Sequence, residues 1–200
     1  MTAREAEIIE LIRKEVKPAL GCTEPIAVAL AVAKAMETVE EKCGLSGPDW
    51  RMEGAYSLCI EVSGNILKNG MGVGIPGTGM VGLHIAAALG AVCGKSSYGL
   101  EVLNDLDEDS IAKAKEMVEA KDVTVGLAET DHKLYVKATV LCKDGHSACA
   151  VIEDDHDNIV ETWFDQAQLT SSHKCEGADA AAQKSTLDYK LTVKEIVDFA

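Results

Sequence analysis

Residues 21–44 read GCTEPIAVALAVAKAMETVEEKCG, and this stretch decides the fold that we predict. Thr23 is a good helix N-cap, Pro25 suits the first turn of a helix, and Gly44 provides a C-terminal stop. From residue 26 to residue 33 the helix is apolar on every side, so its first half should be buried. The sequence therefore predicts a core that is built around buried helices.

Hydrophobic periodicity divides the rest of the chain into a helical part and a strand-rich part. Apolar residues at helical spacing predict amphipathic helices at 3–16 and 109–120. The small residues that follow the glycine-rich segment predict a further helix at 80–92. Alternating apolar residues predict one early strand at 56–62. After Lys121 the period changes to two, which predicts strands at 123–129, 134–142, 147–153 and 159–164, with a hairpin turn at Asp144 and Gly145.

These elements indicate an α+β fold with buried helices around the Cys-Thr-Glu-Pro turn and a glycine-rich loop, plus a small antiparallel-sheet subdomain. We expect a mainly helical region at 1–121 that holds the substrate site, and a β-rich subdomain at 122–165. Residues 166–200 read as a linker and the start of a helix that is truncated.

Composition excludes several classes of partner. The chain of 200 residues has 19 Lys and Arg against 33 Asp and Glu, a net charge of −14. Nucleic acids and anionic membranes both require a basic surface, so we expect neither as the main partner. Aromatic residues make up only 4%, too few for base-stacking platforms. A local basic pocket for a small anion stays compatible with these numbers.

Compartment is indicated by the N-terminus and the cysteines. The first residues are charged where a signal peptide is apolar, and the longest apolar stretch, residues 80–93, is 14 residues long. Seven cysteines occur at irregular spacing without a C-x-x-C motif. We therefore expect reduced thiols and a cytoplasmic location.

Cys22 lies just before the N-terminus of the long helix. Backbone N–H groups and the helix dipole stabilise an anion at such a position, either the Cys22 thiolate or a substrate carboxylate. An ionised Glu24 would oppose the thiolate. The alternative is a buried, inert cysteine.

The glycine-rich segment at 63–79 is the second candidate site. Its part from Gly72 to Gly77 formally matches the phosphate-binding G-x-G-x-x-G pattern, but the preceding strand ends ten residues too early and Pro76 removes a donor. The glycines either let the backbone approach a small polar ligand or form a tight loop between helices. Lys68 beside them is expected to be solvated or to bind a substrate carboxylate.

Three separated stretches resemble the L-cysteine desulfidase family, also called the L-serine dehydratase alpha-chain-like proteins. They are KPALGCTEP at 17–25, NILKNGMG at 65–72 and PGTGMVGL at 76–83, with further similarity at 86–90 and 99–103. The resemblance covers nearly all of this chain but only about the N-terminal half of the family's usual length.

This resemblance implies the N-terminal part of an iron–sulfur lyase. Such an enzyme carries out α,β-elimination of L-cysteine to pyruvate, ammonia and sulfide, or of L-serine to pyruvate and ammonia. A base removes the α-proton and a Lewis acid polarises the leaving group. A [4Fe-4S] cluster would be that Lewis acid, with most ligands outside this chain, in a C-terminal half or a second subunit.

The resemblance also assigns roles to residues. Cys22 stands where related serine dehydratases have a histidine, as catalytic base or as the residue that touches the cluster; this chain contributes no other metal contact. The implied substrate-binding residues are Thr23, Glu24, Ser63, Asn65, Lys68, Asn69, Gly70, Gly72, Gly77, Thr78 and Gly79. The resemblance further implies a homo-oligomer that acts on a small amino acid.

Two other classes of function stay open. One is a non-catalytic small-molecule-binding or regulatory module, with the sheet at 122–165 as a small-molecule or partner site. The other is a nucleotide-binding enzyme that uses the glycine-rich loop. The sequence does not choose between cysteine and serine as substrate, and it does not give the oligomeric state.

Overall fold

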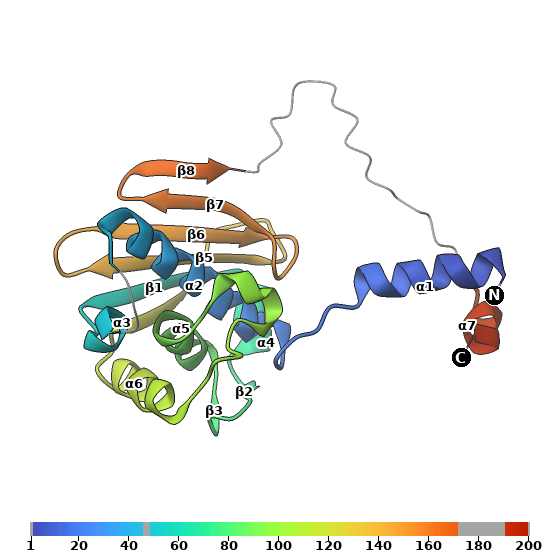
Figure 1. Ribbon diagram of the computed structural model, residues 1–200, viewed down its shortest axis with the longest axis horizontal. Coiled ribbons are helices and arrows are strands. Elements are labelled where there is room, and N and C mark those ends of the chain that lie inside the picture. The colour runs from blue at the N-terminus through green and yellow to red at the C-terminus, as the bar shows by residue number, and fades with distance from the viewer. Residues whose placement is uncertain (1, 46–48, 172–190, 200) are drawn as a thin grey trace. The chain divides into compact units, whose positions relative to one another are not determined.

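The computed structural model describes residues 2–45, 49–171 and 191–199, which fall into two compact units (Figure 1). Unit 1 combines the two ends of the chain, Met1–Lys17 and Lys174–Ala200, and unit 2 is Pro18–His173. The division predicted at 121/122 is not followed, because strand β1 (Tyr56–Val62) joins the same sheet as the strands after residue 122. The predicted α+β class is correct, as helices and a six-stranded sheet share unit 2.

The sheet of unit 2 has the strand order β4-β1-β5-β6-β7-β8. Its further strands are β4 (Val123–Leu127), β5 (Tyr135–Cys142), β6 (Ser147–Glu153), β7 (Ile159–Phe164) and β8 (Ala167–Ser171). Four pairings are antiparallel, whereas β1 and β4 run parallel. The sheet is therefore mixed, and the wholly antiparallel subdomain that we predicted is wrong in this respect.

The helices of unit 2 gather on one face of the sheet (Figure 1). They are α2 (Thr23–Cys43), α3 (Asp49–Glu53), α4 (Gly64–Gly70), α5 (Leu83–Val92) and α6 (Glu108–Glu119), with a 3-10 helix at Ser96–Glu101. Helix α2 packs against β5, β6 and β7, and α5 packs between α2 and α6. Strands β1 and β5 send alternate side chains into this layer, as β1 does with Leu58, Ile60 and Val62.

Helix α2 occupies the place that its sequence predicts. Every residue from Pro25 to Ala33 is buried, and Gly44 ends the helix in the left-handed conformation with φ 66°. The N-cap, however, is Cys22 rather than Thr23, and it makes no side-chain capping bond. The N-cap side chain therefore accepts no hydrogen bond from the backbone N–H groups of the first turn.

Arg51 is the polar anchor of the helical layer. Its guanidinium donates from Nε and Nη2 to the two carboxylate oxygens of Glu40, each over 2.7 Å, and from Nη1 to the carbonyl oxygen of Gly94 over 2.9 Å. Arg51 is buried. A fork of this kind satisfies a buried charge on each side and ties α3 to α2 and to the end of α5.

The glycine-rich segment forms small regular elements that the sequence did not predict. After α4 it makes a hairpin of β2 (Gly74–Ile75) and β3 (Met80–Val81) before α5 begins. The helix predicted from residue 80 therefore starts at Leu83. Gly77 and Gly79 have positive φ at the tip of this hairpin, which explains glycine at both positions.

Unit 1 consists of α1 (Ala3–Glu15) and α7 (Val193–Phe199), joined by an ion pair of 3.0 Å between Arg4 Nε and Glu195 Oε1. Both helices were predicted, α1 as the helix at 3–16 and α7 as the helix that begins within 166–200. The predicted linker at 166–190 is wrong for residues 167–171, which form β8, and residues 172–190 with Cys175 lie outside the described residues. Among the described residues, no helix is both long and apolar enough to cross a bilayer.

Candidate functional site

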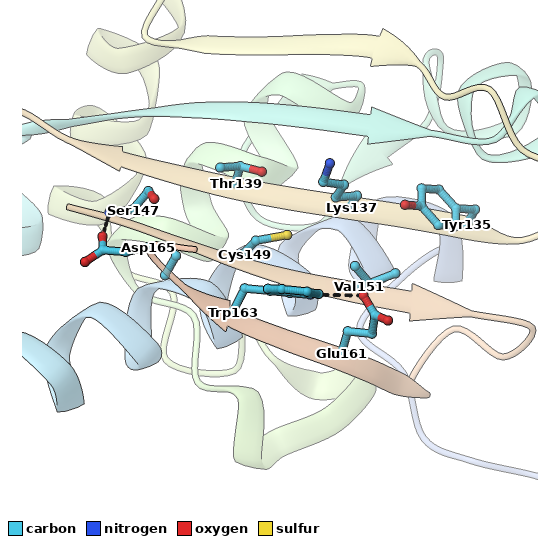
Figure 2. Close-up of a pocket in the computed structure, with 10 residues that line it drawn as sticks. Tyr135, Lys137, Thr139, Ser147, Cys149, Val151, Glu161, Trp163 and Asp165 are labelled. Carbon is cyan, nitrogen blue, oxygen red and sulfur yellow. Dashed lines mark hydrogen bonds between the residues drawn. The ribbon is translucent and has the colours of Figure 1, made fainter. Parts of the chain in front are cut away.

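A cavity of about 370 Å³ opens on the face of the sheet opposite the helices, over β5, β6 and β7 (Figure 2). Its side chains come from alternate positions along these strands, because successive side chains of a strand point to opposite faces. They supply charged, hydroxyl, thiol and aromatic groups: Tyr135, Lys137, Thr139, Ser147, Cys149, Val151, Glu161, Trp163 and Asp165.

Lys137, Val151 and Glu161 form one cross-strand row in this cavity. Lys137 pairs with Val151 between β5 and β6, and Val151 pairs with Glu161 between β6 and β7. Neighbouring strands lie about 4.8 Å apart, so the backbones that carry the ammonium and the carboxylate are about 10 Å apart. Val151 is buried and forms an apolar floor between the two charges.

Trp163 lies in the adjacent row, Thr139–Cys149–Trp163. Its indole Nε1 donates a hydrogen bond of 3.0 Å to Oε2 of Glu161, which holds the ring beside the carboxylate (Figure 2). Burial raises the pKa of the Cys149 thiol, so this residue stays neutral at physiological pH. The row thus contributes a flat aromatic wall and a neutral floor rather than a nucleophile.

Lys137 forms an ion pair with Glu61 on β1. Its Nζ lies 3.1 Å from Oε2 of Glu61, and this hydrogen bond raises the pKa of Lys137. Both side chains are about two-fifths exposed, and such pairs contribute only about 0–1 kcal/mol. Lys137 is therefore charged, and it loses little by turning toward another carboxylate.

The two ends of the cavity differ. At one end Ser147 N donates to Oδ1 of Asp165 over 3.0 Å; this bond, together with His146, lowers the pKa of the Asp165 carboxyl. At the other end burial raises the pKa of Tyr135, which therefore stays a neutral hydroxyl. With Glu61, Glu161 and Asp165 against Lys137, the surroundings carry an excess of negative charge.

A larger cavity of about 640 Å³ lies among α2, α5 and α6, and four of the carboxylates that line it are already engaged. Glu40 binds Arg51, Glu37 accepts from the backbone and hydroxyl of Ser96, and Asp105 pairs with Lys95. Asp107 caps α6 through Ser110 N. Because these bonds hold the fold together, we assign no ligand to this cavity.

The predicted site at Cys22 is assembled in part. Cys22 Sγ lies 2.8 Å from Glu24 Oε2 and donates to it, and Asn69 Nδ2 donates to Glu24 Oε1 over 3.2 Å. The bond to Glu24 raises the pKa of Cys22 and lowers that of Glu24. The carboxylate thus opposes the thiolate that the helix N-terminus would favour. Thr23, the first residue of α2, lies between them in sequence.

The remaining predicted residues divide between structural positions and the surface. Ser63 is buried, donates to the carbonyl oxygen of Lys133 and accepts from Tyr135 N; Thr78 bridges Ile75 O and Met80 N inside the hairpin. Gly70 leaves room for the Leu83 side chain. The others are exposed, namely Asn65, Lys68, Gly72, Gly77 and Gly79. Roles in substrate binding stay a prediction for all of them.

The glycine pattern at 72–77 does not build a phosphate cradle. Gly74 belongs to β2, and Gly77 lies in the turn between β2 and β3. The segment therefore crosses a hairpin instead of linking a strand directly to a helix, as the dinucleotide motif requires. A methyl group on Gly21 would lie 3.0 Å from Cδ of Pro76, so this hairpin packs against the start of α2.

The cysteines of the described residues do not converge on a cluster site. Among these residues, no group of three or more His, Cys, Asp or Glu lies close enough to hold a metal ion. Cys22 has Glu24 as its neighbour, and the remaining described cysteines are only partly exposed. The predicted [4Fe-4S] cluster was expected to take most of its ligands from outside this chain, so the described residues do not test it, and we derive no chemistry from it.

The sequence left the sheet at 122–165 open as a small-molecule or partner site, but it did not single out the cavity residues. The signal was the alternation along residues 135–141 and 147–151, which places Lys137, Thr139 and Cys149 together on the polar face. Register decides which of these residues face Glu161 and Trp163, and the sequence does not give the register.

Comparison with known proteins finds similar proteins whose names state no activity. The chain is 42% identical over 196 residues to a UPF0597 protein of Phocaeicola vulgatus, which covers 97% of this chain and 41% of that protein. It is 43% identical over 196 residues to one of Bacteroides thetaiotaomicron and 41% identical over 192 residues to one of Shewanella pealeana, in each case over 42% of the relative. This chain thus spans about two fifths of the length of these curated relatives. No family model and no solved structure matches it.

These matches correct the family and the function that we inferred from the sequence. The relatives are named UPF0597 proteins, not L-cysteine desulfidases or L-serine dehydratases, and that name states no reaction. The assignment to the iron–sulfur lyases is therefore wrong. The three stretches behind it contain glycines, prolines and small residues that form turns and close contacts here, as Gly21 does with Pro76 and Gly70 with Leu83.

Proposed function

We propose that this chain is a binding module for a small zwitterionic amino compound, such as a free α-amino acid, on the face of the sheet opposite the helices. The observation that carries the proposal is the row Lys137–Val151–Glu161, in which an ammonium and a carboxylate flank an apolar floor. A zwitterion presents the complementary pair of charges at close spacing.

Each part of the ligand has a partner in the cavity. Its ammonium group would lie beside the Glu161 carboxylate and against the face of Trp163, where a cation gains about 0.5–1 kcal/mol at an exposed site. Its carboxylate would take the Lys137 ammonium from Glu61. An apolar side chain would rest on Val151 and Cys149, which line the floor.

The size and exposure of the cavity set the expected affinity. A volume of about 370 Å³ is at the lower end of ligand pockets and suits a molecule of amino-acid size. Because the charged partners are exposed, each contributes little, and we expect a dissociation constant of about 0.1–1 mM. Such an affinity suits a metabolite that is present at high concentration.

The test is a titration with the common L-amino acids, followed by tryptophan fluorescence and calorimetry. For each amino acid that binds, the N-acetyl derivative and the methyl ester should bind at least about fivefold more weakly, because each lacks one of the two charges. Trp163→Phe should remove the fluorescence change, since the other tryptophan, Trp50, lies in the helical layer.

Variants separate the cavity from general charge effects. Lys137→Met and Glu161→Gln should each weaken binding by about three- to tenfold. Lys115→Met and Glu119→Gln on α6 make the same charge changes at exposed positions of another element and should leave the affinity unchanged. Equal loss in all four variants, or equal binding of the zwitterion and its blocked derivatives, would refute the proposal.

A further inference from the structure

Glu61 stands beside the cavity on the open face of the sheet. It lies on β1 directly opposite Lys137 of β5, in the cross-strand row that continues through Val151 to Glu161. Neighbouring strands are about 4.8 Å apart, so Glu61 is as close to Lys137 on one side as Val151 is on the other. The Lys137 ammonium thus lies between the Glu61 carboxylate and the floor of the cavity.

This single ammonium has to serve two carboxylates when a zwitterion binds. Its Nζ lies 3.1 Å from Oε2 of Glu61. Among the described residues, Lys137 is the only basic side chain that lines the cavity. Beyond Glu61 the row continues to Gly126 of β4, which contributes no side chain. Glu61 and the carboxylate of the ligand therefore compete for the same partner.

The negative charge of Glu61 also reaches the lining of the cavity. Burial is the main cause of the raised pKa of Cys149, and the charge of Glu61 adds to it. At Tyr135 burial again comes first, and Glu61 is among the charges that raise the pKa further. A ligand that brings an additional negative charge into the cavity would meet the same repulsion.

We propose that Glu61 determines the specificity of this site by competing for Lys137, so that the ligands are amino acids without a second carboxylate. The inference rests on the proposed binding function of the cavity. A neutral or basic amino acid brings one carboxylate, which Lys137 can take. L-Glutamate and L-aspartate bring a second one, which meets the carboxylates of Glu161 and Asp165 in addition to that of Glu61.

Pairs of ligands with nearly the same shape isolate this charge. L-Glutamine and L-asparagine differ from L-glutamate and L-aspartate mainly in the charge of the side chain. In calorimetric titrations of the full chain at pH 7, each amide should bind at least about fivefold more tightly than its acid. The methyl ester of L-glutamine reports separately on the binding function, because it keeps the side chain and lacks the carboxylate that Lys137 would take.

Glu61→Gln keeps the size of the side chain and removes its charge. It should strengthen the binding of each neutral amino acid about two- to fivefold, because Lys137 no longer has to leave a carboxylate. It should strengthen the binding of the acids more, so that the preference for the amide falls to about twofold. Such a gain cannot result from a loss of fold.

Glu116→Gln on α6 is the matched control. Glu116 also pairs with a lysine, Lys113, over 3.5 Å, and its loss changes the net charge by the same amount. It lies outside the cavity lining, so the affinities and the preference for the amide should stay those of the wild type. An equal gain in both variants would mean that net charge acts rather than Glu61, and it would overturn the inference.

The remaining outcomes separate this inference from the function on which it rests. If zwitterions bind and the ester does not, but the wild type binds L-glutamate as tightly as L-glutamine, the specificity is wrong and the binding function stands. The same holds if Glu61→Gln strengthens the binding of no neutral amino acid. If no amino acid binds, or the ester binds as tightly as L-glutamine, the binding function fails and the inference fails with it.

Discussion

Glu24 determines the chemistry of the thiol two residues before it. Cys22 sits at the N-terminus of a helix of 21 residues, where the dipole and free N–H groups stabilise a negative charge by about 0.3–1 kcal/mol. Its hydrogen bond to the Glu24 carboxylate works in the opposite direction and raises the pKa of the thiol. The carboxylate acts at 2.8 Å, and so it outweighs the dipole.

We therefore predict that Cys22 is a slow nucleophile at pH 7 and that Glu24→Gln accelerates it. The thiolate is the reacting form, and removing the adjacent negative charge lowers the pKa of Cys22 and raises the thiolate fraction several-fold. The rate of alkylation by iodoacetamide, followed at each cysteine by mass spectrometry, should rise at neutral pH. The pH profile of the variant should move to lower pH.

Cys93 is the internal control for this measurement. Burial raises its pKa to about 11, and Glu24 is not among the causes of that shift. Its alkylation should stay slow in both proteins. If Cys22 reacts equally fast with and without the Glu24 carboxylate, the hydrogen bond does not govern its reactivity and the prediction fails.

At the scale of elements, the contact between α2 and α5 depends on Gly90. A methyl group at this position would lie 2.8 Å from Cα of Ala29 and closer still to its carbonyl oxygen, so it would push against the backbone of α2. Alanine favours a helix over glycine by about 1 kcal/mol, but overpacking of a core costs about 1–3 kcal/mol or more. Because the methyl group would meet backbone atoms of α2, which cannot turn aside as a side chain can, we expect the cost of overpacking to exceed the gain in helix propensity.

Gly90→Ala should accordingly lower the free energy of unfolding by about 2 kcal/mol, measured by urea denaturation. Gly64→Ala provides the comparison, since Gly64 begins α4 and a methyl group there would meet only Leu127 at an ordinary 3.9 Å. That variant should be neutral or slightly more stable. Equal stability of the two variants would mean that α2 and α5 can move apart at no cost.

Periodicity predicted the long elements, because their burial repeats along the chain. Helix α2 and strands β5 and β6 lie within a residue or two of the predicted ranges. Helix α4 escaped notice because glycines at both of its ends suggested a loop, and β8 because its five residues are all exposed. Short elements of this kind are stabilised by neighbours that the local sequence does not contain.

The candidate site depends on contacts that are distant in sequence. Lys137 meets Glu61, 76 residues earlier, and faces Glu161 only through the register of three strands. The parallel pairing of β4 with β1 likewise has no local signal. The sequence could therefore place polar side chains on one face of the strands, but it could not bring these particular charges together.

At the scale of the whole molecule, the excess of acidic residues works against the folded state. Unit 2 carries twenty-four acidic and eleven basic side chains, and folding brings these charges together. The ion pairs of the described residues are mostly exposed, so each contributes little to stability. Net repulsion should therefore exceed the attraction of the individual pairs.

Thermal stability should consequently increase with ionic strength. Raising NaCl from about 10 to 200 mM shortens the Debye length from about 30 to 7 Å and screens the repulsion across unit 2. A gain of about 1 kcal/mol would raise the midpoint of thermal unfolding by about 2–4 °C in a chain of this size. Circular dichroism at one fixed protein concentration measures this midpoint.

The comparison that isolates charge is sucrose at the same osmolarity, because sucrose stabilises through its exclusion from the protein surface without screening charge. The gain with NaCl should exceed that with sucrose, and the difference should shrink at pH 5, where protonation begins to remove carboxylate charge. A midpoint that falls with salt would instead show that attractive pairs, such as Lys137–Glu61 and Lys95–Asp105, outweigh the net charge of −14.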